Sequence, residues 1–305
     1  YQMKFKVFKN SLATLALSVS CFISSANAGL MTYTNTDGSD LFEVPFGVSE
    51  IRVLTIGGGG GGANGHQGGG GAGYLSTGIF SVNALDLFSI TVGQGGAGAL
   101  TAVNSNSIVG ISGGGESSFG NLLSSLGGGV VTGVNQGGHN GSSGGGAACN
   151  SGSLGGAGGS GGSNGQLCAI GSSMPIGLGQ GDYSSLLSIF TESQLTAGAG
   201  GAGGTGSHAG GGGAGGILID NLGISAFDGA QLWSGKGGEG FGAGGGAGGL
   251  DFQVNGNRWA GGNGASGVVY VEWDSPSVDV PEPSTLAIFA LGIFGLAARR
   301  MKKQS

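Results

Sequence analysis

The stretch FEVPFGVSEIRVLTIGGGGGG, residues 42–62, decides the fold class of this chain. Its centre, Ile51–Ile56, is rich in β-branched and aliphatic residues and predicts a strand. Arg52 and Thr55 do not lie on one face of that strand, so strict alternation fails, which is compatible with burial on both sides. Six glycines follow directly at 57–62. The stretch therefore predicts short strands that run straight into glycine tracts.

Glycine supplies 78 of the 305 residues, about a quarter, where an average protein has about 7%. Only five prolines are present and glycine does not recur at every third position, which excludes collagen. An apolar content of 38% argues against charged disorder. Because glycine has no side chain to bury and loses the most entropy on folding, a conventional enzyme core is not expected.

Most basic residues lie at the two ends of the chain. Residues 29–280 contain three basic and fifteen acidic residues, a formal charge of −12. Such a surface repels phosphate backbones, so no nucleic-acid partner is expected.

Residues 3–28 have the pattern of a secretory signal peptide. Three lysines precede an apolar run at 12–23, and an Ala-x-Ala site ends at Ala28, directly before Gly29. We expect a signal helix in the precursor, export through the Sec machinery, and cleavage between Ala28 and Gly29.

The C-terminal segment, 281–303, has the layout of a second targeting signal. A motif at 281–285 precedes an apolar run at 286–298 and a basic tail at 299–303. A thirteen-residue helix spans about 20 Å, which is short for a bilayer, but flanking residues extend it and basic side chains snorkel. The basic tail favours the cytoplasmic side, which leaves the body outside. A plain membrane anchor would share these features.

The pattern from Val280 to Lys303, with Pro281, Glu282 and Pro283 at its start, resembles the PEP-CTERM sorting signal of Gram-negative bacteria. The resemblance implies that exosortase recognises the motif and removes a transmembrane helix. It also implies a protein exported by exopolysaccharide- and biofilm-forming bacteria. Such a protein is anchored transiently in the inner membrane before it reaches the cell surface or extracellular matrix.

The body, residues 29–274, shows no helical apolar stripe, so an all-β fold is expected, followed by a linker at 275–280. Strands are predicted at 41–44, 51–56, 74–80, 87–92, 217–219 and 268–271. Glycine tracts such as 68–73 and 244–249 lead into apolar residues. They are either flexible linkers or extended polyglycine helices with three residues per turn, packed as a polyglycine II-like bundle. The low charge of the tracts favours the bundle.

The order of motifs from Thr32 to Trp273 resembles the bacterial and phage glycine-rich domain. The match begins with F-x-V-P-x-G-V at 42–48, a strand and a glycine run, and closes at 264–273. The resemblance implies glycine segments that pack as polyglycine helices and connecting loops that contact a host surface. Residues 130–195 have no counterpart in that pattern.

Few residues have the pattern of a reactive site. Cys149 and Cys168 remain after signal removal, and we expect a disulfide between them, with two free thiols as the alternative. A G-x-S-x-G match at 158–162 lacks the strand and helix of a nucleophile elbow. The three histidines lie far apart in glycine-rich loops. No cofactor, metal or catalytic residue is therefore predicted.

Aromatic residues gather between 227 and 259 and have two alternative roles. They either fill a sparse core between glycine tracts or stack on sugar rings, for which Trp233, Phe241 and Trp259 are the candidates. The sequence favours a non-enzymatic cell-surface or biofilm-matrix protein, adhesin-like, with an exopolysaccharide or surface glycan as partner. The alternatives are a structural filler without a ligand, a polysaccharide hydrolase with paired carboxylates, and an ice-binding protein.

Overall fold

The computed structural model describes residues 29–65, 67–102, 107–131, 187–191, 195–197, 212–220, 228, 234–251 and 257–274. These residues belong to one compact unit, Ala28–Asp274. Their secondary-structure elements are twelve strands. In chain order these are β1 Gly29–Tyr33, β2 Ser39–Glu43, β3 Glu50–Ile56, β4 Leu75–Ser81, β5 Leu87–Thr91, β6 Ser117–Phe119, β7 Leu123–Ser125, β8 Leu195–Ala197, β9 Ile217–Ile219, β10 Leu250–Asp251, β11 Asn257–Arg258 and β12 Val268–Trp273. The all-β class is confirmed. The expected signal helix and C-terminal helix lie outside the described residues.

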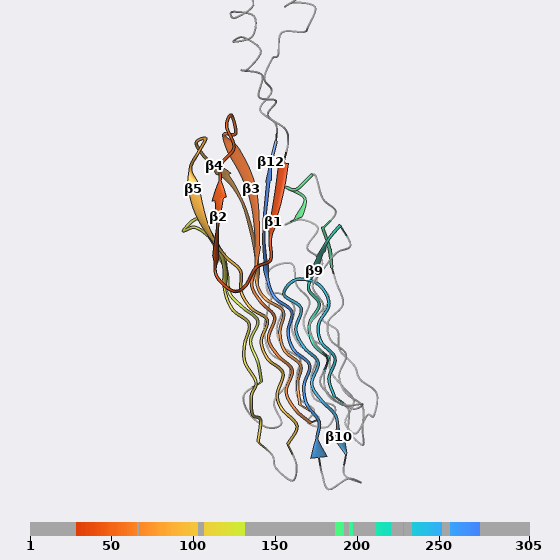
Figure 1. The fold of residues 1–305 in the computed structure, drawn as a ribbon. Coiled ribbons are helices and arrows are strands. Elements are labelled where there is room, and N and C mark those ends of the chain that lie inside the picture. The colour runs from red at the N-terminus through yellow and green to blue at the C-terminus, as the bar shows by residue number, and fades with distance from the viewer. Residues whose placement is uncertain are drawn as a thin grey trace, which may run out of the picture. The chain divides into compact units, whose positions relative to one another are not determined.

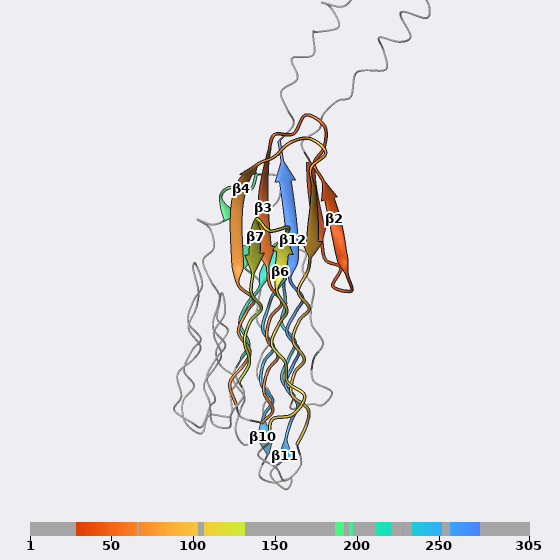
Figure 2. The ribbon, with the colours of Figure 1, turned by 90° about the vertical axis from the view of Figure 1, so that its left-hand side faces the viewer.

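Two antiparallel four-stranded sheets pack into a sandwich (Figure 2). The first sheet has the order β1-β12-β3-β4 and the second β2-β5-β6-β7. Apolar side chains from both sheets fill the space between them, among them Phe42, Phe119 and Trp273. The Phe42 ring lies 5.8 Å from that of Phe119 and 5.6 Å from that of Trp273, centroid to centroid. These inward aromatic residues anchor one face of the first sheet.

The other face of the first sheet is also covered. Leu54 and Tyr270, on β3 and β12, pack there against Phe190, Ile217 and Phe241. Both faces of β3 are thus buried, which explains why its residues do not alternate between apolar and polar. The buried Thr55 hydroxyl lies 2.7 Å from the Ser125 hydroxyl, so even its polar group is satisfied across the sandwich.

The strands continue directly into extended glycine segments that run side by side (Figures 1 and 2). We call these segments together the glycine bundle, and their described residues are 57–63, 71–74, 94–99, 112–115, 126–129, 243–248 and 262–265. The segment 57–62 lies inside it. Its N–H groups donate in turn to segments 71–74, 112–115 and 262–265, at 2.8–3.1 Å, and every third N–H returns to the same neighbour. In each of these pairs the two segments run antiparallel.

The carbonyl groups of 57–62, and the directions in which Cβ atoms would point, face three further segments. Carbonyl oxygens accept from segments 94–99, 126–129 and 243–248, all parallel to it. A Cβ added at any residue of 57–62 would lie closer than 3.0 Å to the backbone of one of these three, again with a period of three. Six neighbours thus satisfy the inner segment without any side chain. Only glycine fits because the backbones touch.

Two buried serines join the sandwich to the bundle. The Ser117 hydroxyl donates to the Ile56 carbonyl at 2.6 Å and accepts from the Gly93 N–H at 2.9 Å. The Ser125 hydroxyl donates to the Thr55 carbonyl at 2.9 Å. Here the sheet hydrogen bonding of β3 ends and the bundle begins, in which successive peptides bond to neighbours in three directions. The two serine hydroxyls provide hydrogen-bond partners for backbone groups at this transition.

Candidate functional site

The two ends of the body meet at one end of the sandwich. Gly29 pairs with Trp273 in the register of β1 and β12, and the loops 44–49 and 82–86 lie at the same end. We call this the proximal end. The bundle runs away from it, and the hairpin of β10 and β11 closes the opposite, distal end (Figure 1). The body thus has its two termini and the loops 44–49 and 82–86 at the proximal end, and a second set of loops at the distal end.

Buried polar side chains hold the distal loops. Asn64, fully buried, donates from Nδ2 to the Leu100 carbonyl at 2.8 Å and to the Ser107 carbonyl at 3.0 Å. The Gly65 N–H donates to the Trp259 carbonyl at 3.0 Å. Gly65 has φ +61°, and an added Cβ would meet the Arg258 side chain, so this turn requires glycine. Loops from three parts of the chain are therefore fixed at one place.

Arg258 and Trp259 stand next to each other at this end. Arg258 is buried, and burial lowers the pKa of its guanidinium. Its backbone exchanges two hydrogen bonds of 2.9 Å with Ala102. Trp259 is half-buried, while Leu100 is 61% exposed and Val109 53% exposed.

The structure separates the three aromatic candidates. Phe241 is buried in the core on the outer face of the first sheet, where its backbone N–H and carbonyl pair with Ile217 at 2.8 and 3.0 Å. Its ring is therefore not available to a sugar, and of the two roles considered it has the core role. Trp259 stays a candidate for contact. Trp233 lies outside the described residues.

Other predicted site residues are placed only in part. Gly29 is the first residue of β1 and lies opposite Trp273 in the register of β1 and β12, where an added Cβ would meet the Trp273 ring. The remaining predicted positions lie outside the described residues: Ala28, Cys149, Cys168, Pro281, Glu282, Pro283 and the three histidines.

A charged cluster at the proximal end was missed by the sequence reasoning. Glu272 is fully buried, and its carboxylate accepts from Arg52 at 3.0 Å, from the Thr191 N–H at 2.9 Å and from the Thr191 hydroxyl at 2.8 Å. Arg52 also pairs with Asp274, which is largely exposed. The hydrogen bond from Arg52 lowers the pKa of Asp274, and the same bond raises the pKa of Arg52. The cluster fastens segment 187–191 to β12. The sequence did contain an indication of this cluster, because Glu272 interrupts the apolar run 268–273 and Arg52 interrupts the strand 51–56.

Neither a metal site nor a membrane span is found within the described ranges. No three histidine, cysteine or acidic side chains there are grouped to hold an ion. No helix of these ranges has the length and apolarity to cross a bilayer. The apolar run 286–298 lies outside them.

Comparisons with known proteins give two family matches. A family model described as a glycine-rich domain matches residues 34–274. A second, described as a PEP-CTERM protein-sorting motif, matches residues 279–303. No curated protein matches the chain.

Proposed function

The chain belongs to the glycine-rich domain family and ends in a PEP-CTERM sorting motif, and on that premise we propose that it is an adhesin-like protein of the cell surface or biofilm matrix. The sorting motif makes it an exported substrate of exosortase. In the proposed function the sandwich is the base beside the sorting signal. The glycine bundle is a stalk, and the distal loops make contact with a glycan.

One observation carries the proposal: the two termini of the body lie at the proximal end, while the loops around Asn64, Leu100 and Trp259 lie at the distal end. Gly29 and Trp273 pair directly, and the sorting motif follows only a few residues after Asp274. A tether attached at the proximal end would therefore leave the distal loops at the opposite end of the body from the attachment point. The architecture fits presentation of a contact surface to the outside.

We infer that the bundle has polyglycine II geometry, with three residues per turn. The support is the threefold repeat of hydrogen bonds and Cβ contacts around segment 57–62. Successive peptides of this segment are tied to three different neighbours in turn, so bending requires breaking bonds in several directions. A stalk of this kind holds its loops firmly without a conventional core.

The distal loops suit a glycan as the ligand, and an anionic glycan where divalent cations bridge it to the acidic body. Trp259, half-buried beside Arg258, offers a ring for stacking. The body is strongly acidic, so a charged polysaccharide would need divalent cations as bridges. Many copies on a polysaccharide layer would convert weak single contacts into firm attachment.

Retention on the producing organism's own exopolysaccharide tests the proposal. Wild-type residues 29–274 should be retained, and more strongly with added calcium, whereas Trp259→Ala and Leu100→Ala should be retained less. The matched control is Leu87→Ala, because Leu87 is as exposed as Leu100 (62% against 61%) but lies at the proximal end. Circular dichroism must show that all three variants stay folded.

Two outcomes would count against the glycan contact. If the wild type is not retained at any calcium concentration, a structural matrix filler without a specific ligand is the better account. Equal loss of retention in Leu87→Ala and Leu100→Ala would mean that the distal loops do not carry the contact.

A further inference from the structure

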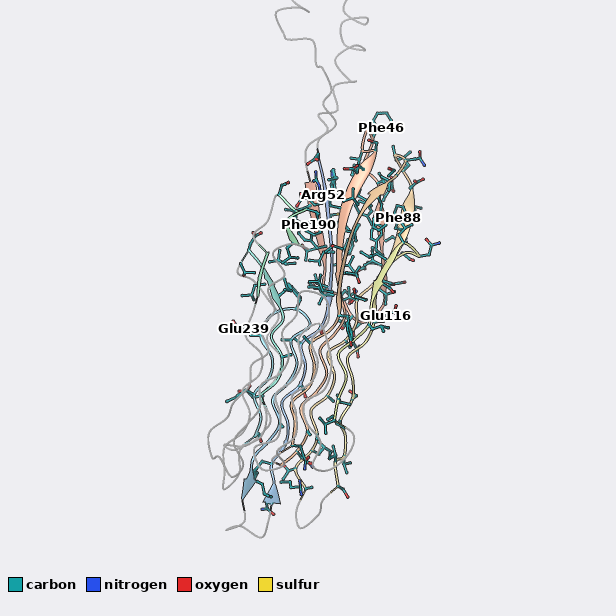
Figure 3. All side chains as sticks on the ribbon, turned by 180° about the vertical axis from the view of Figure 1, so that it is seen from behind. Phe46, Arg52, Phe88, Glu116, Phe190 and Glu239 are labelled. Carbon is teal, nitrogen blue, oxygen red and sulfur yellow. The ribbon has the colours of Figure 1, made fainter. Side chains whose placement is uncertain are left out.

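The proximal end exposes large apolar side chains on two tight turns. Phe46 is 76% exposed and Leu85 is 62% exposed, and Leu87 follows at 62%. Phe46 lies at the very end of the sandwich, beyond Arg52 and Phe88 (Figure 3). The two turns are joined by hydrogen bonds of 2.9 Å, from the Leu85 N–H to the Val44 carbonyl and from the Val44 N–H to the Asp86 carbonyl. Phe46 and Leu85 therefore belong to one surface, which we call the proximal tip.

The backbone holds both side chains outward. Phe46 occupies the second position of a turn closed by the Val48 N–H and the Pro45 carbonyl, with Gly47 at φ +86°. Leu85 has φ +69°, a left-handed conformation that is strained for a branched apolar residue. Asp86 fixes this turn by accepting from the Asn83 N–H at 2.8 Å. An exposed leucine with a strained backbone does not stabilise the fold, which points to a role in binding.

We propose that the proximal tip inserts Phe46 and Leu85 into the interface of a lipid bilayer while the chain is still membrane-tethered. This inference rests on the proposed function, because it uses the tether at the sorting signal. Only residues 275–285 separate Asp274 from the apolar run 286–298. Eleven residues span at most about 40 Å when fully extended, so the tip stays within reach of the bilayer surface.

The size and charge of the tip favour lipid over a second copy of the chain. A stable protein interface buries about 800 Å² per partner, and the few apolar side chains on two tight turns supply a fraction of that area. Protruding side chains suit insertion between headgroups. Glu43 and Glu50 are exposed at the same end, so the tip should prefer zwitterionic to anionic lipid.

Quenching by brominated lipid tests the insertion. The full chain is reconstituted into phosphatidylcholine vesicles that contain a lipid brominated in its acyl chain. An inserted side chain lies about 5–10 Å inside the interface, so the fluorescence that Phe46→Trp adds should be quenched about twofold or more beyond that added by Leu100→Trp. Leu100 is the matched position because it is similarly exposed but distal. Ser49→Trp, in the same loop as Phe46, separates insertion from mere proximity and should be quenched less than Phe46→Trp.

A second substitution checks the partner residue. Adding Leu85→Asn to Phe46→Trp should reduce the quenching, because asparagine accepts the left-handed backbone but is not apolar. Adding Leu100→Asn instead should leave it unchanged. Replacing half of the phosphatidylcholine with phosphatidylglycerol should also reduce it.

Each contrary result has a distinct meaning. Equal quenching of Phe46→Trp and Leu100→Trp in chains that resist carbonate extraction overturns the insertion and leaves the tether intact. A blue-shifted Phe46→Trp emission without lipid quenching overturns it in favour of a protein contact. A full chain that carbonate extracts from the vesicles contradicts the tether of the proposed function, and the insertion with it.

Discussion

Gly60 offers the sharpest test of the glycine bundle. Its N–H donates to Gly71 and its carbonyl accepts from Gly245, both at 2.9 Å. A Cβ at this position would lie closer than 3.0 Å to the carbonyl of Gly129, which is backbone and cannot rotate away. Gly60→Ala must therefore push segment 126–129 outward and stretch the bonds around it.

The expected cost follows from two contributions. Forcing one methyl group into a packed interior costs about 1–3 kcal/mol. Weakening two backbone hydrogen bonds adds about 1 kcal/mol each at most. Together these give a loss of about 1–5 kcal/mol, which in a domain of this size lowers Tm by about 2–20 °C.

Gly38→Ala is the matched control. A Cβ at Gly38 meets nothing within 4 Å and its φ is not in the left-handed region, so alanine there should be neutral or stabilise by about 0.5 kcal/mol. Gly113→Ala, whose Cβ meets only the Gly128 carbonyl at 3.2 Å, should fall between the two. The measurement is thermal unfolding of residues 29–274 by circular dichroism. If Gly60→Ala and Gly38→Ala unfold at the same temperature, the close-contact argument is wrong.

Three further predictions concern the junction, the proximal charges and processing. Ser117→Ala should lower the free energy of unfolding by about 1–3 kcal/mol in urea, because the buried Gly93 N–H loses its partner; an unchanged midpoint would contradict the role given to this hydroxyl. Since the pKa of Asp274 is lowered by Arg52, the stability from this pair is fully present at neutral pH and declines as pH falls through the acidic range below the ordinary aspartate pKa. Asp274→Asn should flatten that acid decline, and a decline identical to the wild type would refute it. Intact-mass analysis of protein from the producing organism should give a chain that begins at Gly29 and lacks 286–305, and a retained C-terminus in cells with active exosortase would refute the processing.

The sequence predicted the strands that carry their own apolar signal. The predicted strand 51–56 corresponds to β3, and 87–92 to β5, each within about one residue. β1 was not predicted because Gly29–Tyr33 does not alternate between apolar and polar residues. It forms a strand because it pairs with β12, which is distant in the sequence. β6 and β7 are three residues each, too short for a periodic pattern.

The glycine segments were the hardest part to predict. Their sequence gives no information on neighbours, because a glycine inside the bundle and one in a linker look the same. Segment 57–62 is fixed by contacts with residues as distant as 265, and no local pattern encodes such pairs. Trp259 was predicted as a contact residue from its aromatic side chain, and the structure places it at the distal end, where its role stays a prediction. The proximal tip was overlooked because Phe46 stands in a loop motif, where exposure cannot be read from spacing.

The position of β12 has a consequence for the order in which the body folds. This strand lies between β1 and β3, yet it is the last strand of the body to be made and the last to leave the cytoplasm. β1, the first to emerge, has no partner in its sheet other than β12 among the described strands. The first sheet therefore stays open until residues 268–273 have crossed, only a few residues ahead of the sorting signal. Completion of the fold and arrival of the signal at the membrane are thus nearly simultaneous, so a protein released before that moment would be released unfinished.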